Sequence, residues 1–258
     1  MKLNVNVELD YSLSAPADIL LQIEVAKLPD QHVLNDNLVL SEAGRDTRIS
    51  GEDGIGERLW LHRKEGITAS YTATVDIKRQ ALDCRELDQS PVHQLPSETV
   101  KYLMGSRYCN VSKFQSFVMS EFGDWTGGDR VMRMRDWIEE RFSYTPGASN
   151  AETTAVDTFV SRQGICRDYA HVLIAFARAS AIPARMASVY AVGVEPPDFH
   201  AVAEVYLGGD WQLVDPTGMA PVDGIAKIGI GRDAADISFL TCYGAATLNT
   251  QSVEVAEA

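Results

Sequence analysis

The sequence has few cysteines, no long apolar run and few basic residues, and each shortage excludes a class of protein. Its four cysteines, at positions 84, 109, 166 and 242, form no Cys-x-x-Cys pair. Neither a disulfide framework nor a zinc ribbon is therefore expected. No apolar run approaches the ~20 residues that cross a bilayer, and residues 1–6 lack the apolar stretch of a secretory signal. We therefore expect a cytoplasmic protein.

The balance of charge limits the partners. Acidic residues outnumber basic ones by 36 to 23 among the 258 residues, which gives a formal net charge of −13. An acidic chain without a basic cluster is repelled by nucleic acid and by anionic membrane surfaces. Hydrophobic residues make up 45% of the chain, as is typical of globular proteins. We therefore expect neither nucleic acid nor a membrane as a partner.

Residues 1–82 show the period-two hydrophobic pattern of β-strands. Strand-like runs cover residues 3–9, 19–25, 33–40, 57–62 and 67–77. Short polar turns rich in Gly, Pro and Asp separate these runs. Six or so short strands in this length predict an antiparallel β-sandwich or barrel as the N-terminal domain. No catalytic constellation is visible there, since its two histidines stand alone.

The composition and the hydrophobic pattern of the sequence change after residue 82. Two prolines and a charged run indicate a connector at residues 83–97, followed by a second domain over residues 98–258. Apolar residues there repeat with the helical period over 111–122 and 131–142. Beyond residue 183 the period becomes two again, which predicts strands. The sequence thus predicts an α+β protein with helices packed on an antiparallel sheet in its second domain.

Cys166 falls at the first turn of a long predicted helix. A shorter helix, opened by the capping-box residues Thr154 and Asp157, ends at Gly164 just before it. Apolar residues then repeat at helical spacing over residues 170–181. A thiol at a helix N-terminus meets unpaired backbone N–H groups and the positive end of the helix dipole, which favour thiolate over thiol. Cys166 is therefore a candidate nucleophile, although a lone cysteine is more often a buried packing residue.

A predicted hairpin places a histidine near a carboxylate. Strand-like runs at residues 200–207 and 210–215 flank two adjacent glycines. If these glycines form the turn, Val202 lies opposite Asp215, and His200 lies diagonal to Asp215 on the same face. A loop longer by one residue would place Asp215 on the other face. The register therefore predicts a hydrogen bond from His200 to Asp215.

Taken together, Cys166, His200 and Asp215 supply the three roles that acyl transfer through a thioester needs. These roles are a thiolate nucleophile, an imidazole acid and base, and a carboxylate that orients the imidazole.

Several short segments also resemble a known family. They are Gly164-Ile165-Cys166-Arg167-Asp168-Tyr169-Ala170-His171, Ile182-Pro183-Ala184-Arg185, Phe199-His200-Ala201, Glu204-Val205-Tyr206 and Asp215-Pro216-Thr217. Over about residues 98–220 the chain resembles the transglutaminase-like superfamily, which has the papain-like fold. Its β-rich N-terminus and residues 106–109 look like the bacterial subgroup of transglutaminase-like cysteine proteases.

The resemblance implies a site and leaves one feature unmatched. It implies Cys166 as nucleophile, His200 as general base and acid, and Asp215 as its orienting partner. The family usually has an aromatic residue two positions after the histidine, where this chain has Val202. We therefore expect a different wall beside the site.

The expected reaction needs donors for an oxyanion and no cofactor. The backbone N–H of Cys166 is one expected donor; Gln163 and Tyr108 are candidates for the second. Asp168, in the first helical turn, is expected to support the helix dipole. The expected substrate is a peptide or a protein.

Other readings of these residues remain open. Hydrolysis and transfer to an amine share the same acyl-enzyme, so residue types do not separate a protease or amidase from a transglutaminase. The resemblance to bacterial cysteine proteases implies hydrolysis of a peptide or amide bond, with amine transfer as the alternative. A binding module that has kept the fold and lost turnover is a second alternative. A metal site built from Cys166, Asp168, His171 and His200 is a third, but their spacing lacks a usual zinc pattern.

Overall fold

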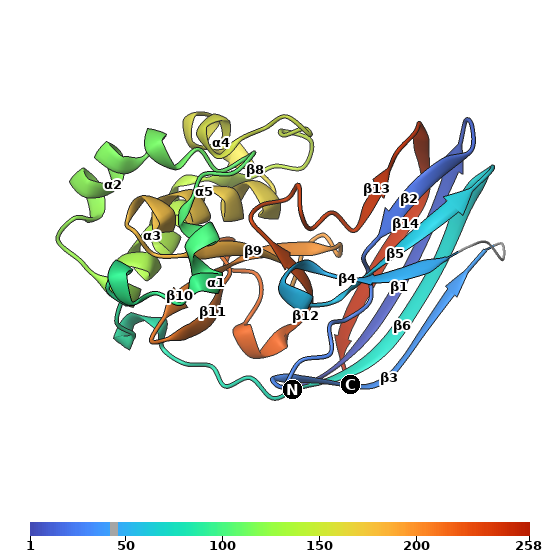
Figure 1. Ribbon diagram of the computed structural model, residues 1–258, viewed down its shortest axis with the longest axis horizontal. Coiled ribbons are helices and arrows are strands. Elements are labelled where there is room, and N and C mark those ends of the chain that lie inside the picture. The colour runs from blue at the N-terminus through green and yellow to red at the C-terminus, as the bar shows by residue number, and fades with distance from the viewer. Residues whose placement is uncertain (42–45) are drawn as a thin grey trace.

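The computed structural model describes residues 1–41 and 46–258. Its N-terminal part contains strands β1 (Lys2–Leu13), β2 (Ala17–Leu21), β3 (Gln31–Leu40), β4 (Thr47–Ser50), β5 (Glu57–Arg63) and β6 (Gly66–Ile77). They belong to two antiparallel sheets, ordered β14-β1-β6-β3 and β13-β2-β5-β4. The predicted antiparallel domain is therefore confirmed, and it takes the form of a sandwich (Figure 1).

The period-two pattern places one face of each sheet in a shared core. Along β1, Leu3, Val5 and Val7 are buried while the residues between them are exposed. They pack with Ile19 of β2 and Leu61 of β5 from the other sheet. Burying apolar surface between two sheets stabilises the sandwich by about 25 cal/mol per Å².

The C-terminal end of the chain completes both N-terminal sheets. Strand β13 (Leu240–Cys242) pairs with β2, and β14 (Ala246–Glu257) pairs with β1 along almost its whole length. Both chain termini therefore lie together (Figure 1). The backbone of residues 251–257 pairs with β1, so this end of the chain is held in the sheet. The division into domains at residues 1–82, 83–97 and 98–258 stays a prediction. The pairing of β13 with β2 and of β14 with β1 shows that the last two strands belong to the N-terminal sheets.

The second unit has helices on one face of a four-stranded antiparallel sheet, ordered β11-β10-β9-β12. Its strands are β9 (Ala184–Ala191), β10 (His200–Leu207), β11 (Asp210–Val214) and β12 (Ile225–Gly231). Its helices are α1 (Ser97–Val100), α2 (Gln115–Phe122), α3 (Gly127–Arg141), α4 (Ala155–Ser161) and α5 (Cys166–Ala179). A short parallel pair, β7 (Ser143–Tyr144) and β8 (Gln163–Gly164), lies beside them. The predicted α+β class is confirmed.

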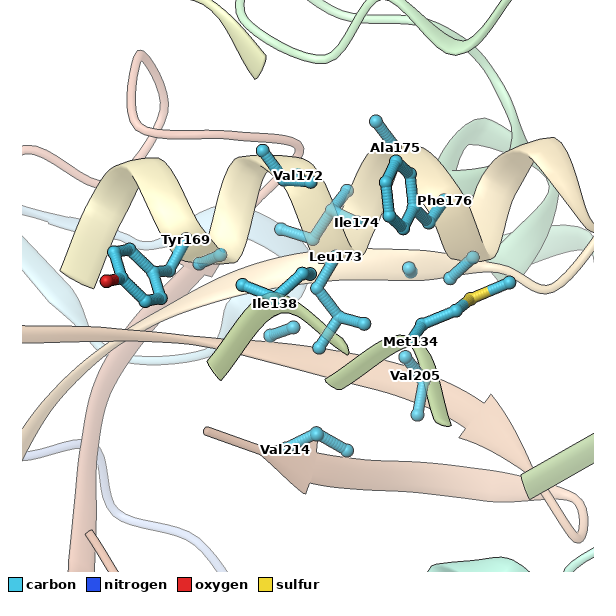
Figure 2. Close-up of a cluster of buried hydrophobic side chains, with 14 of the residues drawn as sticks. Met134, Ile138, Tyr169, Val172, Leu173, Ile174, Ala175, Phe176, Val205 and Val214 are labelled. Carbon is cyan, nitrogen blue, oxygen red and sulfur yellow. The ribbon is translucent and has the colours of Figure 1, made fainter. Parts of the chain in front are cut away.

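Helix α5 lies at the centre of this unit. Residues around nearly its whole circumference are buried, as expected of a helix packed on all sides. Figure 2 shows Leu173 projecting from α5 toward Ile138 of α3 and Val205 of β10. No helix in the described ranges has both the length and the apolar content needed to cross a membrane.

The hairpin has the predicted register. Leu207 faces Asp210 across the two-glycine turn, and Ala203 pairs with Val214. Gly208 and Gly209 both have positive φ, of 63° and 85°, as two-residue hairpin turns require. Asp215 directly follows the last residue of β11. It therefore lies at the same end of the hairpin as His200, the first residue of β10.

Candidate active site

The N-terminus of α5 places Cys166 as the first helical residue. Ile165 is the N-cap, and Oδ2 of Asp168 accepts a hydrogen bond from its backbone N–H at 2.9 Å. Oδ1 of Asp168 also accepts hydrogen bonds from Arg167. The carboxylate is fully buried, so it holds the first turn in place. A Cβ at Gly164 would lie 2.7 Å from the Asp168 Cβ, which explains the glycine at that position.

His200 and Asp215 are joined by a buried hydrogen bond. Nε2 of His200 lies 3.0 Å from Oδ2 of Asp215, and both side chains are nearly inaccessible to water. The Asp215 carboxylate is itself held by other donors. It accepts hydrogen bonds from the backbone N–H groups of Thr217 and Ala220 and from the Thr217 hydroxyl. The carboxylate therefore has a fixed direction toward the imidazole.

The Cys166 thiol lies beside the imidazole of His200. Because Asp215 occupies Nε2, the thiol next to His200 is left with Nδ1. Among the described residues, Nδ1 has no hydrogen-bond partner. Cys166 is 7% exposed, which keeps the thiol in contact with the cleft described below. The structure thus brings together the three residues that the sequence singled out.

The charges of this cluster shift the pKa values of His200 and Asp215 in opposite directions. Burial by itself lowers the pKa of His200, but hydrogen bonds to Asp215 and Cys166, with attraction to both, raise it to about 10. Burial raises the pKa of Asp215, and the His200 hydrogen bond and charge outweigh it, so this pKa is lowered. An imidazolium between two acidic partners is therefore the favoured form at neutral pH.

Tyr144 is a member of the cluster that the sequence did not indicate. It pairs with Gly164 in the β7–β8 ladder, and its hydroxyl lies beside both the thiol and the backbone N–H of Cys166. Burial and the neighbouring Cys166 raise the pKa of Tyr144, which keeps its hydroxyl protonated. No local pattern around Tyr144 signals this contact, because the parallel bridge to β8 creates it.

A cleft of about 440 Å³ opens beside Cys166 and His200. One wall contains Ile165, Arg167 and Tyr108. The other wall comes from residues 234–241, the segment that leads into β13. Met186 and Ala201 contribute from the sheet. The cleft therefore lies between the helical layer and a segment tied to the N-terminal sandwich.

Neither residue suggested as the second oxyanion donor is placed for that role. Gln163 is exposed on β8 and does not line the cleft. Tyr108 does line it, but its hydroxyl donates its proton to the carbonyl of Ala151 at 2.8 Å. The ring of Tyr108 stacks on His171, with centroids 5.0 Å apart. Its position is thus that of a packing residue in the cleft wall.

Val202 does not form the wall beside the site, contrary to expectation. It is fully buried and packs with Ala187, Val189 and Leu213, so it does not line the cleft. Strand β10 contributes His200 and Ala201 to the cleft lining, and Val202 is not part of it. The absence of an aromatic residue at position 202 therefore affects the packing of this hydrophobic cluster.

The alternative of a metal site finds no support in the geometry. Asp168 caps α5, and Nε2 of His171 accepts a hydrogen bond from the backbone N–H of Ala234 at 3.2 Å. Burial lowers the pKa of His171 well below its ordinary value. Across residues 1–41 and 46–258, no group of three or more His, Cys, Asp or Glu side chains is arranged to hold a metal ion.

Comparison with known proteins places this architecture in a family. The transglutaminase-like superfamily matches residues 119–216, and the bacterial transglutaminase N-terminal domain matches residues 1–98. The crystal structure of a "Putative Cysteine Protease" from Cytophaga hutchinsonii is 35% identical. It covers 99% of this chain and 90% of its own, with a TM-score of 0.94.

Two curated relatives match over shorter lengths. An uncharacterized protein of Mycobacterium leprae is 30% identical over 118 residues, which are 42% of each chain. One from Mycobacterium tuberculosis is 31% identical over 111 residues, covering 37% of this chain and 35% of its own. The chain thus spans about two fifths or less of the length of these relatives. The two family matches, together with the match to the solved structure over nearly the full length of both chains, show that it belongs to the transglutaminase-like superfamily.

Proposed function

We propose that this protein hydrolyses a peptide or amide bond by thiol-dependent acyl transfer through Cys166, His200 and Asp215. The observation that carries the proposal is the buried 3.0 Å contact between His200 and Asp215, with the Cys166 thiol beside the same imidazole. A nucleophile, an acid and base, and an orienting carboxylate in this order are the requirements of such chemistry.

The reaction follows from these positions. The Cys166 thiolate attacks the carbonyl carbon, a C–S bond forms, and the carbonyl electron pair moves to oxygen. As the C–N bond breaks, His200 gives its Nδ1 proton to the departing amine, which leaves a thioester. Neutral His200 then takes a proton from water, the resulting hydroxide attacks the thioester, and the acid and the thiolate are released.

The developing oxyanion needs two donors, and Tyr144 supplies the second in this proposal. The first is the backbone N–H of Cys166 at the α5 N-terminus. The Tyr144 hydroxyl lies next to that N–H but outside the residues that line the cleft, so a carbonyl oxygen meets both groups only by entering between them. Removing one such donor typically costs about 10²–10³-fold in kcat.

Water access favours hydrolysis over transfer to an amine. The cleft is bordered by the exposed residues Arg107, Asp198 and Ser238, so water can reach the thioester. Amine transfer competes best where water is excluded.

We propose the cytoplasm as the compartment, because all four cysteines are free thiols.

Peptide and amine libraries offered to wild type and to Cys166→Ala test the proposal. Wild type is expected to release amine and to form a thioester on Cys166 that mass spectrometry detects after acid quenching. Cys84→Ala, which removes a half-buried thiol outside the cleft, is the matched control and should behave as wild type. Equal turnover by wild type and Cys166→Ala would show that the assignment of Cys166 is wrong. The absence of any thioester and any turnover would identify a binding module instead.

A further inference from the structure

The segment after β12 contributes two large apolar residues to the lining of the cleft and contacts the residue that precedes His200. Ile237 and Phe239 of this segment line the cleft. The ring of Phe239 stacks on Phe199, with centroids 4.2 Å apart and planes inclined by 8°. Phe199 is adjacent in sequence to His200, so this stacked pair lies next to the reactive groups.

The N-terminal sandwich holds this wall in place. The backbone N–H of Gln22 donates to the carbonyl of Phe239 at 2.8 Å. From β5, Arg58 donates to the carbonyl of Asp236 at 2.9 Å. Directly after Phe239, strand β13 pairs with β2, and Figure 1 shows the chain crossing there from the helical unit to the sheets. The cleft is therefore assembled from both parts of the molecule.

One part of the cleft is lined by the apolar residues Met186, Ile237 and Phe239, and the exposed charged residues Arg107 and Asp198 line another. Met186 and Ile237 are almost completely buried. A large apolar side chain placed against Ile237 and Phe239 would leave water, which is favourable. A polar side chain of the same size would lose hydrogen bonds to water and gain none from these residues.

We propose that Ile237, Phe239 and Phe199 form a subsite for a large aliphatic or aromatic side chain of the substrate, close to the reacting carbonyl. The inference rests on the proposed thiol-dependent function, since it names the class of peptide that the same cleft accepts. It also assigns a role to the N-terminal sandwich, which positions the wall that selects the substrate.

The test uses N-acetyl dipeptidyl chloromethyl ketones. At each of the two dipeptide positions in turn, a reagent with Leu is compared with a reagent that has Asn, a side chain of nearly the same shape. The thiolate of Cys166 displaces chloride, and mass spectrometry follows the labelling rate. Each rate is divided by the rate of the same variant with iodoacetamide, which has no side chain to recognise. Wild type is expected to prefer Leu over Asn by at least about tenfold at one of the two positions.

Variants of the wall show which residues create the preference. Phe239→Ser and Ile237→Ser are each expected to lower the Leu-to-Asn ratio at least about fivefold. Phe239→Leu retains an apolar wall and should keep most of the ratio. Met119→Ser changes an exposed residue of α2 and is the control that should keep the wild-type ratio. Two independent serine variants guard against the failure of one to fold.

Binding without the thiol separates the two proposals. Calorimetry of Cys166→Ala with the matching Leu and Asn dipeptide amides should show the same preference even if the thiol of wild type proves unreactive. A wild-type ratio near one together with equal binding of both amides overturns the subsite. A wild-type preference that both serine variants retain overturns the assignment to Ile237 and Phe239.

Discussion

Nε2 of His200 and Oδ2 of Asp215 lie 3.0 Å apart across the end of one hairpin. His200 is the first residue of β10, and Asp215 directly follows β11. Three further hydrogen bonds from Thr217 and Ala220 aim the carboxylate at the ring. The carboxylate is therefore positioned both to orient the imidazole and to stabilise its charged form.

Replacing Asp215 by Asn removes the charge and keeps the size. We expect kcat/KM to fall by about 10²–10⁴-fold, because the imidazolium loses its partner and the ring its fixed tautomer. The pKa of His200, followed by NMR, should fall as well. Asp210→Asn, at the exposed turn of the same hairpin, is the control. An Asp215→Asn variant with wild-type kcat/KM would contradict the orienting role.

The raised pKa of His200 predicts how activity depends on pH. Hydrolysis of an amide should decline as pH rises through about 10, where the imidazolium loses its proton. Alkylation by iodoacetamide needs no proton donor and should not decline there. Since the folded pKa lies above the unfolded value of 6.5, protonation of His200 stabilises the fold fully below pH 6.5. That contribution is lost as pH rises through about 10. A hydrolysis rate that declines already near pH 7 would contradict this assignment; circular dichroism checks the fold.

Tyr144→Phe removes the hydroxyl next to Cys166 and leaves the ring. We expect kcat to fall by about 10²-fold with KM little changed, because an oxyanion donor acts in the transition state. Tyr206→Phe, on β10 and outside the cleft lining, is the matched control. A rise in kcat for Tyr144→Phe would mean that the hydroxyl obstructs the oxyanion position.

Gly164→Ala should destabilise the fold through the helix cap. The added Cβ would lie 2.7 Å from the Cβ of Asp168, so the capping carboxylate must shift. We expect a loss of about 1–3 kcal/mol in the free energy of unfolding, measured by urea denaturation. At Gly105 the nearest atom to an added Cβ is 3.4 Å away, and Gly105→Ala should cost less than about 0.5 kcal/mol. Equal effects of the two substitutions would contradict the close contact.

Local patterns predicted the elements that carry the three central residues. The capping box of Thr154 and Asp157 is present as expected, and the hairpin has its predicted register. The expected helix over 111–122 is shorter, since α2 begins at Gln115 after a 3-10 turn at Val111–Lys113. Such boundaries depend on packing against α5 as much as on the periodicity of the segment.

By itself, the sequence determined which side chains stand at the start of α5, at the start of β10 and after β11, because helix caps, two-residue turns and strand alternation act over a few residues. Only the tertiary structure decided that Tyr144 lies beside Cys166, that β14 pairs with β1, and that Phe239 forms a wall against Phe199. These contacts join segments far apart in the chain. Their free energy comes from burial and pairing between whole elements, which no local pattern records.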